Sequence, residues 1–246
     1  MKSFCVSLTS IPPRFLGLEK TLISLNEQEI QPEKIFLNIP KYFERFSNSD
    51  FDFNSLLKKY ENLEIISCND FGPGTKLLGA YKKITKYDYV VLVDDDHIYN
   101  NQMLKIFYEQ ALISLDKSYS FCVYDLMDCK IGQGADGFLI NTQFVKGMLK
   151  FYDKYVKNNK KLFLNDDLWI SIYLNKVLKI DIVSVFTFLK QPFFKKYKSI
   201  YKKHTQIEAI IETYNSDRKK ARNLKFKENC DEYLLLKKKT NSFKDV

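Results

Sequence analysis

Three consecutive aspartates follow an apolar run that has the length and composition of a buried strand. The run covers residues 89–93, and Asp94, Asp95 and Asp96 come directly after it. Because side chains alternate along an extended chain, Asp94 and Asp96 are expected to project to one side and Asp95 to the other. Two aligned carboxylates supply the hard oxygen ligands that Mg²⁺ and Mn²⁺ prefer. The triplet therefore predicts a divalent-metal site, although an aspartate at this position could also cap the next helix.

The segments on both sides of this aspartate triplet alternate short β-rich runs with longer runs of helical period. The pattern predicts an α/β fold with a doubly wound, mostly parallel sheet flanked by helices. Strands are expected at residues 4–8, 34–38, 63–67, 89–93, 119–124 and 138–140, and helices at residues 16–27, 75–84, 102–115, 143–155 and 167–176. In open sheets of this kind, ligands bind beyond the carboxyl ends of the strands, which is where the triplet falls.

The net positive charge comes from the C-terminal part of the chain. Residues 1–189 contain 23 basic and 23 acidic side chains, whereas residues 190–246 contain 16 basic and 7 acidic ones and so account for the whole net charge of +9. We therefore expect a domain over residues 1–189 and a basic, aromatic and helical extension over residues 190–246 that packs on it. Only four of the 39 basic residues are arginines, which disfavours a protein that reads nucleic-acid sequence.

The cysteines and the hydropathy of the sequence indicate in which cellular compartment the protein is expected. The five cysteines are scattered and form no C-x-x-C pair, which is typical of reduced thiols in a cytoplasmic protein. No apolar run reaches the ~20 residues of a membrane-spanning helix, and the N-terminus lacks the pattern of a signal peptide. Lysines and aromatic residues are interleaved over residues 193–203, which suits peripheral contact with an anionic membrane. The alternative is that these aromatic residues pack on the domain while the lysines stay in water.

Four stretches of the sequence resemble the GT-A glycosyltransferases, and within them the family-2-like enzymes of bacterial and large-virus surface-glycan synthesis. The stretches are residues 6–15, 35–40, 70–80 and 93–97, and the resemblance covers about residues 3–175. It implies that residues 1–189 form a GT-A nucleotide-sugar-binding and catalytic domain. It also implies a metal-dependent hexosyltransferase that moves a sugar from a nucleoside-diphosphate sugar, by default a UDP-sugar, to a hydroxyl of a glycan or lipid-linked acceptor, with inversion.

The resemblance also implies roles for individual residues on the donor side. At the nucleotide sugar it places Thr9, Arg14, Lys76, Asp94 and Asp95. At a Mn²⁺ or Mg²⁺ ion it places Asp94, Asp96 and the late histidine His204. An ordinary loop, a surface lysine and a solvated histidine remain the alternatives for Thr9, Lys76 and His204.

On the acceptor side, the resemblance places Gly134, Asp136, Gly137 and Trp169. The pair of Asp166 and Asp167, called the acidic pair below, is similar to the family's acidic residues at the start of a helix, where the second carboxylate is the general base. This sequence has Asp-Asp where the family usually has Glu-Asp, so the choice of Asp167 over Asp166 is open. The structural alternatives are a simple turn for Gly134 and Gly137, a place in the core for Trp169 and a helix cap for the acidic pair.

Two other functions are compatible with parts of the sequence. Residues 72–76, Gly-Pro-Gly-Thr-Lys, are similar to the G-x-G-T-R loop of sugar-phosphate nucleotidyltransferases. That loop normally follows the first strand, whereas here it follows the third. A non-enzymatic lysine-rich binding protein is the second alternative, and it would leave the aligned carboxylates unexplained.

Overall fold

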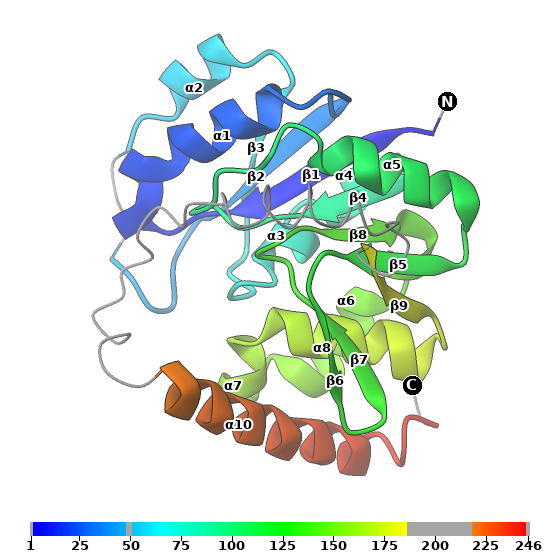
Figure 1. Ribbon diagram of the computed structural model, residues 1–246. Helices are drawn as coiled ribbons and strands as arrows, with labels where there is room; N and C mark the ends of the chain where they lie inside the picture. Colours follow the sequence, from blue (N-terminus) through cyan, green and yellow to red (C-terminus); the bar gives the residue numbers. More distant parts are fainter. Residues whose placement is uncertain (1, 48–50, 186–217, 245–246) are drawn as a thin grey trace.

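The computed structural model describes residues 2–47, 51–185 and 218–244 (Figure 1). Its main sheet has seven strands in the order β3-β2-β1-β4-β8-β5-β9. Their bounds are β1 Phe4–Thr9, β2 Lys34–Pro40, β3 Leu63–Cys68, β4 Tyr89–Leu92, β5 Lys117–Ser120, β8 Phe138–Asn141 and β9 Asp181–Ser184. Neighbouring strands pair in parallel except at β8, which runs antiparallel to both β4 and β5. The predicted α/β class and the mostly parallel sheet are confirmed.

Helices cover both faces of the sheet (Figure 1). One face packs against α1 Leu18–Asn26, α2 Asn54–Lys59 and α5 Met103–Ile113. The other packs against α3 Thr75–Leu78, α6 Met148–Phe151, α7 Lys160–Phe163, α8 Asp166–Ile172 and α10 Arg218–Lys239. Alternate side chains of β4 divide between these two cores, so that Val91 packs in the first and Val90 in the second. Because both faces of β4 are buried, its sequence is an unbroken apolar run.

The predicted strand at residues 119–124 is wrong, because the chain leaves the main sheet in the middle of that run. β5 ends at Ser120, and a separate hairpin follows, with β6 Val123–Leu126 and β7 Cys129–Gly132. The Ser120 hydroxyl lies 3.1 Å from the carbonyl oxygen of Cys122 and 3.0 Å from that of Gln133, and so holds the two ends of the hairpin together. No glycine or proline interrupts residues 119–124, so the pattern contains no sign of the break.

The predicted helices are present, but some are interrupted. The helix expected at residues 75–84 is divided into α3 and α4 Tyr81–Ile84 near Gly79, where a Cβ would lie 2.8 Å from atoms of Asn38. The helix expected at residues 143–155 consists of a 3₁₀ turn, α6 and a π-helical turn over Tyr152–Val156. The elements α2, α7, β7 and β9 were not predicted, because four to six residues are too few to show a period.

The C-terminal helix α10 packs on the same side of the sheet as α8 (Figure 1). Its Tyr233 and Leu236 are completely buried in the core cluster that also contains Leu168 of α8. Three predictions concern residues outside the described part of the chain: the domain boundary at 189/190, the metal ligand His204 and the membrane-facing segment at 193–203. Among the described residues, no helix is both long enough and apolar enough to cross a membrane.

Candidate active site

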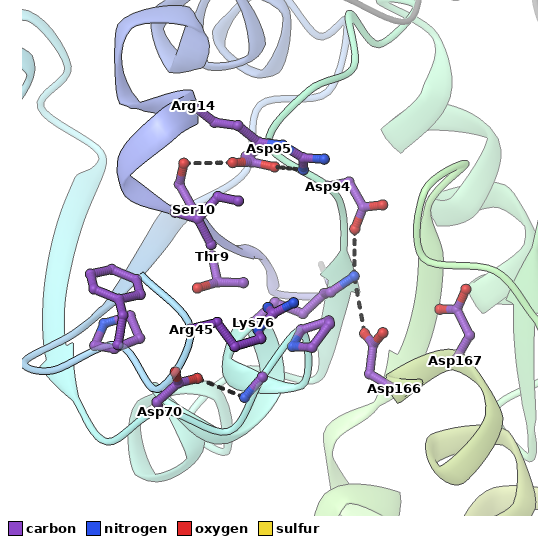
Figure 2. A pocket seen from close by; sticks show the side chains of 15 residues that line it. Thr9, Ser10, Arg14, Arg45, Asp70, Lys76, Asp94, Asp95, Asp166 and Asp167 are labelled. Atoms are coloured by element: carbon purple, nitrogen blue, oxygen red, sulfur yellow. Dashed lines mark hydrogen bonds and ion pairs between the residues drawn. The ribbon is translucent and has the colours of Figure 1, made fainter. Parts of the chain in front are cut away.

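The carboxyl ends of the parallel strands β1 to β4 surround a pocket of about 300 Å³ (Figure 2). Thr9 ends β1, Pro40 ends β2, Asp70 follows β3 and Asp94 follows β4, so each strand contributes to the wall. The lining residues are Thr9, Ser10, Ile11, Arg14, Pro40, Phe43, Arg45, Asp70, Gly72, Pro73, Lys76, Asp94, Asp95, Asp166 and Asp167. Seven of them are predicted site residues, and the pocket lies at the sheet edge where the sequence placed it.

Lys76 lies buried between the aspartate triplet and the acidic pair. Its Nζ is 2.5 Å from Asp94 Oδ1 and 3.1 Å from Asp166 Oδ2, so one ammonium joins the end of β4 to α8 (Figure 2). Burial by itself would lower the pKa of Lys76, but the negative charges of Asp166, Asp94 and Asp167 outweigh it and hold that pKa well above its ordinary value. Lys76 therefore carries its positive charge throughout the physiological pH range.

Polar contacts from β1 and β2 fix the backbone of Lys76. The Ser7 hydroxyl donates to the Lys76 carbonyl oxygen at 2.5 Å, and the Asn38 amide donates to Ser7 Oγ at 2.9 Å. The turn between β3 and α3 is closed by a hydrogen bond from Phe71 N to Thr75 Oγ1 at 2.9 Å. Ser7 and Asn38 are completely buried, so they set the point from which the lysine side chain enters the pocket.

Arg14 holds the other two carboxylates of the triplet. Its Nη1 donates to Asp95 Oδ1 at 2.8 Å, and its Nη2 lies 3.1 Å from Asp96 Oδ2. Ser10 Oγ donates to the second oxygen of Asp95 at 2.5 Å. Burial raises the pKa of Asp95, although Arg14 and Ser10 act in the opposite direction. β4 ends at Leu92, so the triplet lies in the turn after the strand, and the alternation argument, which assumed an extended chain, does not describe it.

Asp94, Asp96 and His97 are the described residues that could hold a divalent metal. One ligand atom from each lies within 4.8 Å of the others, and His97 Nδ1 is 2.9 Å from Asp96 Oδ1. The carboxylates of the triplet and the acidic pair outnumber the two cations paired with them, Arg14 and Lys76, and the remaining negative charge is one that a divalent ion would offset. Carboxylate oxygens together with an imidazole nitrogen suit Mn²⁺, so these residues fit the predicted ion.

His97 was not in the predicted set of ligands, although it directly follows the triplet in the sequence. Burial lowers the pKa of His97, but its hydrogen bond with Asp96 and the charge of Asp94 outweigh that effect, and the pKa is raised. Behind the triplet, Tyr99 Oη accepts a hydrogen bond from Asp94 N at 2.8 Å and donates to the Ala135 carbonyl oxygen at 3.0 Å. Tyr99 thereby ties the triplet to the glycine-containing loop at residues 134–137.

Asp167 faces that loop. Its Oδ1 accepts a hydrogen bond from Gly134 N at 2.8 Å. A Cβ at Gly134 would lie 3.1 Å from Lys76 Nζ and 3.2 Å from Asp167 Oδ1, so the missing side chain lets the backbone approach both charged groups. Burial, and after it the charge of Asp166, raises the pKa of Asp167 well above that of an ordinary aspartate.

Two of the predicted acceptor residues pack in the interior. Trp169 is completely buried, and its ring packs against Gly74, where a Cβ would lie 2.6 Å away. Its predicted role as a sugar platform is corrected, because the ring offers no surface to a ligand. Gly137 has a φ of +94°, and a Cβ there would lie 2.9 Å from the Phe107 ring. Backbone geometry and packing therefore account for this glycine, while Asp136 lies on the same loop outside the lining of the pocket.

Three polar side chains of the lining belong to residues that were not predicted as site residues: Ser10, Arg45 and Asp70. Asp70 accepts hydrogen bonds from Gly72 N at 2.7 Å and from Glu44 N at 2.9 Å, which ties the loop after β2 to the turn after β3. Arg45 lies on that loop and points toward the pocket from the side of Asp70 (Figure 2). The composition could have singled out Arg45, because the chain has only four arginines and two of them line this pocket.

The structure is similar to solved structures of GT-A glycosyltransferases. Residues 1–349 of TarS from S. aureus match with a TM-score of 0.50 at 13% sequence identity, over 98% of this chain and 83% of that one. The mannosyltransferase PcManGT from Pyrobaculum calidifontis, in complex with GDP-Man and Mn²⁺, matches with a TM-score of 0.52 at 12% identity, over 74% of this chain and 54% of that one. TarS 1–349 in complex with UDP matches with a TM-score of 0.49 at 15% identity, over 74% and 58%.

In the last two comparisons, the match spans little more than half of the solved chain. No protein-family model matches the sequence, and no curated protein matches it. At such low sequence identity the likeness establishes the fold, which is GT-A, as the family resemblance implied.

Proposed function

We propose that this protein is a glycosyltransferase that moves a sugar from a nucleoside-diphosphate sugar to a hydroxyl of a glycan or lipid-linked acceptor. The observation that carries the proposal is the arrangement around Lys76, which has the aspartate triplet on one side and the acidic pair of α8 on the other, in one pocket of a GT-A fold (Figure 2). The triplet offers groups suited to a metal-bound diphosphate, and the acidic pair offers a base. A displacement reaction needs both, held close together.

We assign the nucleotide part of the donor to the wall formed by the ends of β1, β2 and β3. Thr9, Arg14, Arg45 and Asp70 lie on this wall. The fork of a guanidinium matches two phosphate oxygens, so Arg45 suits an anionic diphosphate, whereas the fork of Arg14 is engaged by Asp95 and Asp96. The complex of PcManGT with GDP-Man supports a nucleotide sugar as the class of donor, since that enzyme shares the fold. The choice of UDP as the nucleotide of the donor rests on the family resemblance alone.

In this proposal Asp94, Asp96 and His97 hold the divalent ion. An ion held by these residues would supply positive charge that offsets the negative charge of the departing nucleoside diphosphate. Arg14 contributes by orientation, because its hydrogen bond to Asp95 and its ion pair with Asp96 keep two neighbouring carboxylates in fixed positions. The Mn²⁺ in the PcManGT complex supports this ion for the fold.

Asp167 is the proposed general base, and Asp166 is its neighbour that pairs with Lys76. The Gly134 N–H binds Asp167 Oδ1, so the proton of the acceptor hydroxyl goes to Oδ2. Because its pKa is raised, Asp167 is a stronger base than an ordinary aspartate, and base strength near the working pH favours proton transfer. A single displacement assisted by this base inverts the configuration at the anomeric carbon.

A panel of nucleotide sugars tests the proposal. The full chain is incubated with each donor and Mn²⁺, with and without EDTA, and the released nucleoside diphosphate is measured. We expect slow, metal-dependent hydrolysis of one or a few donors, because the site activates the donor even when water replaces the acceptor. Release or consumption of pyrophosphate would identify a nucleotidyltransferase instead. If no donor is turned over and no nucleotide binds, the result would favour the non-enzymatic binding protein.

A further inference from the structure

The side chain that immediately precedes the acidic pair is bound by the C-terminal helix. Asn165 stands at the start of α8, yet its side chain makes no capping hydrogen bond there. Its Nδ2 instead donates to two side chains of α10, to Asn229 Oδ1 at 2.9 Å and to Glu232 Oε2 at 3.0 Å. These three residues are only 7%, 5% and 3% exposed, respectively. α10 thus reaches the residue next to the acidic pair through the interior of the protein.

At its other contacts α10 is anchored to the β6–β7 hairpin. Asn229 Nδ2 donates to Tyr124 Oη on β6 at 2.9 Å. The completely buried Tyr233 donates through its hydroxyl to Asp128 Oδ1, between β6 and β7, at 2.5 Å. Asp128 also pairs with Lys176 at 3.0 Å. The hairpin therefore sets the position of α10, and α10 in turn sets the position of Asn165.

Hydrophobic packing does not explain why Asn229 and Glu232 are polar. Burying a carboxylate or an amide costs free energy unless hydrogen bonds compensate, and apolar residues would pack the same interface without that cost. A buried polar network that is satisfied in one arrangement favours that arrangement over others. The network therefore defines where the start of α8 lies, in addition to holding α10 in place.

We propose that Asn229 and Glu232 of α10 are positioning residues for the acidic pair: by binding Asn165, they fix the start of α8 relative to the rest of the pocket. The inference rests on the proposed function, in which Asp167 is the base. Two short contacts depend on this placement, from Asp166 to Lys76 at 3.1 Å and from Asp167 to Gly134 N at 2.8 Å. A displacement of α8 by about 1 Å would disturb both and misplace the base.

Three variants of the full chain test the proposal with kinetics. Glu232→Ala removes one of the two acceptors for Asn165, and Glu232→Gln keeps a carbonyl oxygen that can accept the same hydrogen bond. The control is Thr240→Val, which removes two hydrogen bonds of a buried hydroxyl just after the end of α10, away from Asn165 and from the hairpin. We expect Glu232→Ala to lower kcat by about 10-fold or more while KM for the donor stays within about twofold. Glu232→Gln should recover most of the wild-type kcat. Thr240→Val should lower Tm and leave kcat unchanged.

A thermal-unfolding cycle tests the same proposal without using activity. Tm is measured at one pH for the wild type, Glu232→Ala, Asp167→Asn and the double variant. If Glu232 positions the acidic pair through Asn165, its loss changes the surroundings of Asp167, and the two Tm shifts are not additive. If the wild type transfers no sugar from any donor, the proposed function fails and this cycle alone decides the inference. Additive Tm shifts, or an unchanged kcat in Glu232→Ala, would overturn it.

Discussion

Asp166 Oδ2 lies 3.1 Å from the ammonium nitrogen of Lys76, and both side chains are almost completely withdrawn from solvent. The contact joins α8 to the short helix after β3 and so brings the acidic pair to the sheet edge where the aspartate triplet lies. Salt screens a buried pair of charges much less than an exposed pair. If one charge is removed, the other remains unpaired in the interior, which is costly. The stability of the fold and the geometry of the site therefore depend on the same ammonium.

Replacing Lys76 with methionine should destabilise the protein by about 3 kcal/mol, the scale observed when one partner of a buried ion pair is removed. The free energy of unfolding is measured by urea denaturation at neutral pH. Lys83→Met is the matched control, because Lys83 pairs with Glu64 at the surface, where an ion pair contributes about 1 kcal/mol or less. Equal losses from the two substitutions would contradict the buried role of Lys76.

Asp167→Asn should slow sugar transfer by ~10² or more while the affinity for the donor nucleotide stays near that of the wild type. The amide cannot take a proton from the acceptor hydroxyl, yet it occupies the same volume beside Gly134. Asp166→Asn is the comparison, and it should have the smaller effect on kcat because Asp166 pairs with Lys76 and is not the proposed base. The reverse order of the two effects, measured by steady-state kinetics, would make Asp166 the base.

Stability should fall as pH rises, through the titration of Asp167. Its pKa is raised in the folded protein, so the folded state retains a proton that the unfolded state has already released. This loss of stability begins near the ordinary aspartate pKa of about 4 and ends where folded Asp167 ionises. In metal-free buffer, Tm of the wild type should therefore decrease more steeply between pH 5 and neutrality than Tm of Asp167→Asn. Parallel curves for the two proteins would show that Asp167 titrates normally.

The sequence predicted the parts of the site better than the contacts between them. The alternating β-rich and helical runs placed Asp94 at the carboxyl end of a strand, where ligands bind in an open α/β fold, and the family resemblance added Lys76. The ion pair of Lys76 with Asp166 could not be predicted, since it depends on how α8 packs, and no local pattern encodes that packing. The same reason applies to Trp169, whose type suits both a sugar platform and a core, and to Asn165, whose partners lie far away in α10.

Asp96→Ala should remove metal-dependent nucleotide binding and abolish turnover. Asp96 supplies one of the three ligand positions of the candidate metal site. Mn²⁺ binding is measured by electron paramagnetic resonance with UDP or GDP present, and circular dichroism reports on the fold. A small loss of stability is expected, since Asp96 interacts favourably with Arg14 and His97. Asp125→Ala is the control, because Asp125 is an exposed carboxylate on β6, and near-normal Mn²⁺-dependent transfer by Asp96→Ala would refute the metal site.

Arg45→Ala should weaken nucleotide binding without affecting the chemistry that follows. Arg45 is an exposed residue that lines the pocket, and its guanidinium lies over the Phe46 ring at 5.2 Å, which restricts its conformations before a ligand binds. A charge-assisted hydrogen bond to a phosphate contributes about 1.5–3 kcal/mol, so its loss should raise Kd for the nucleoside diphosphate by about 10-fold or more. Calorimetric titration with UDP and with GDP measures this.

The control for Arg45→Ala is Lys58→Ala, which removes an exposed positive charge on α2 away from the pocket lining and should leave Kd unchanged. Because the net charge changes equally in both variants, a difference between them reports a local contact and not the overall field of the protein. The effect of Arg45→Ala should also persist in EDTA, since Arg45 is not one of the candidate metal ligands. Equal affinities in the two variants would remove Arg45 from the donor site and leave Arg14 as the arginine of that wall.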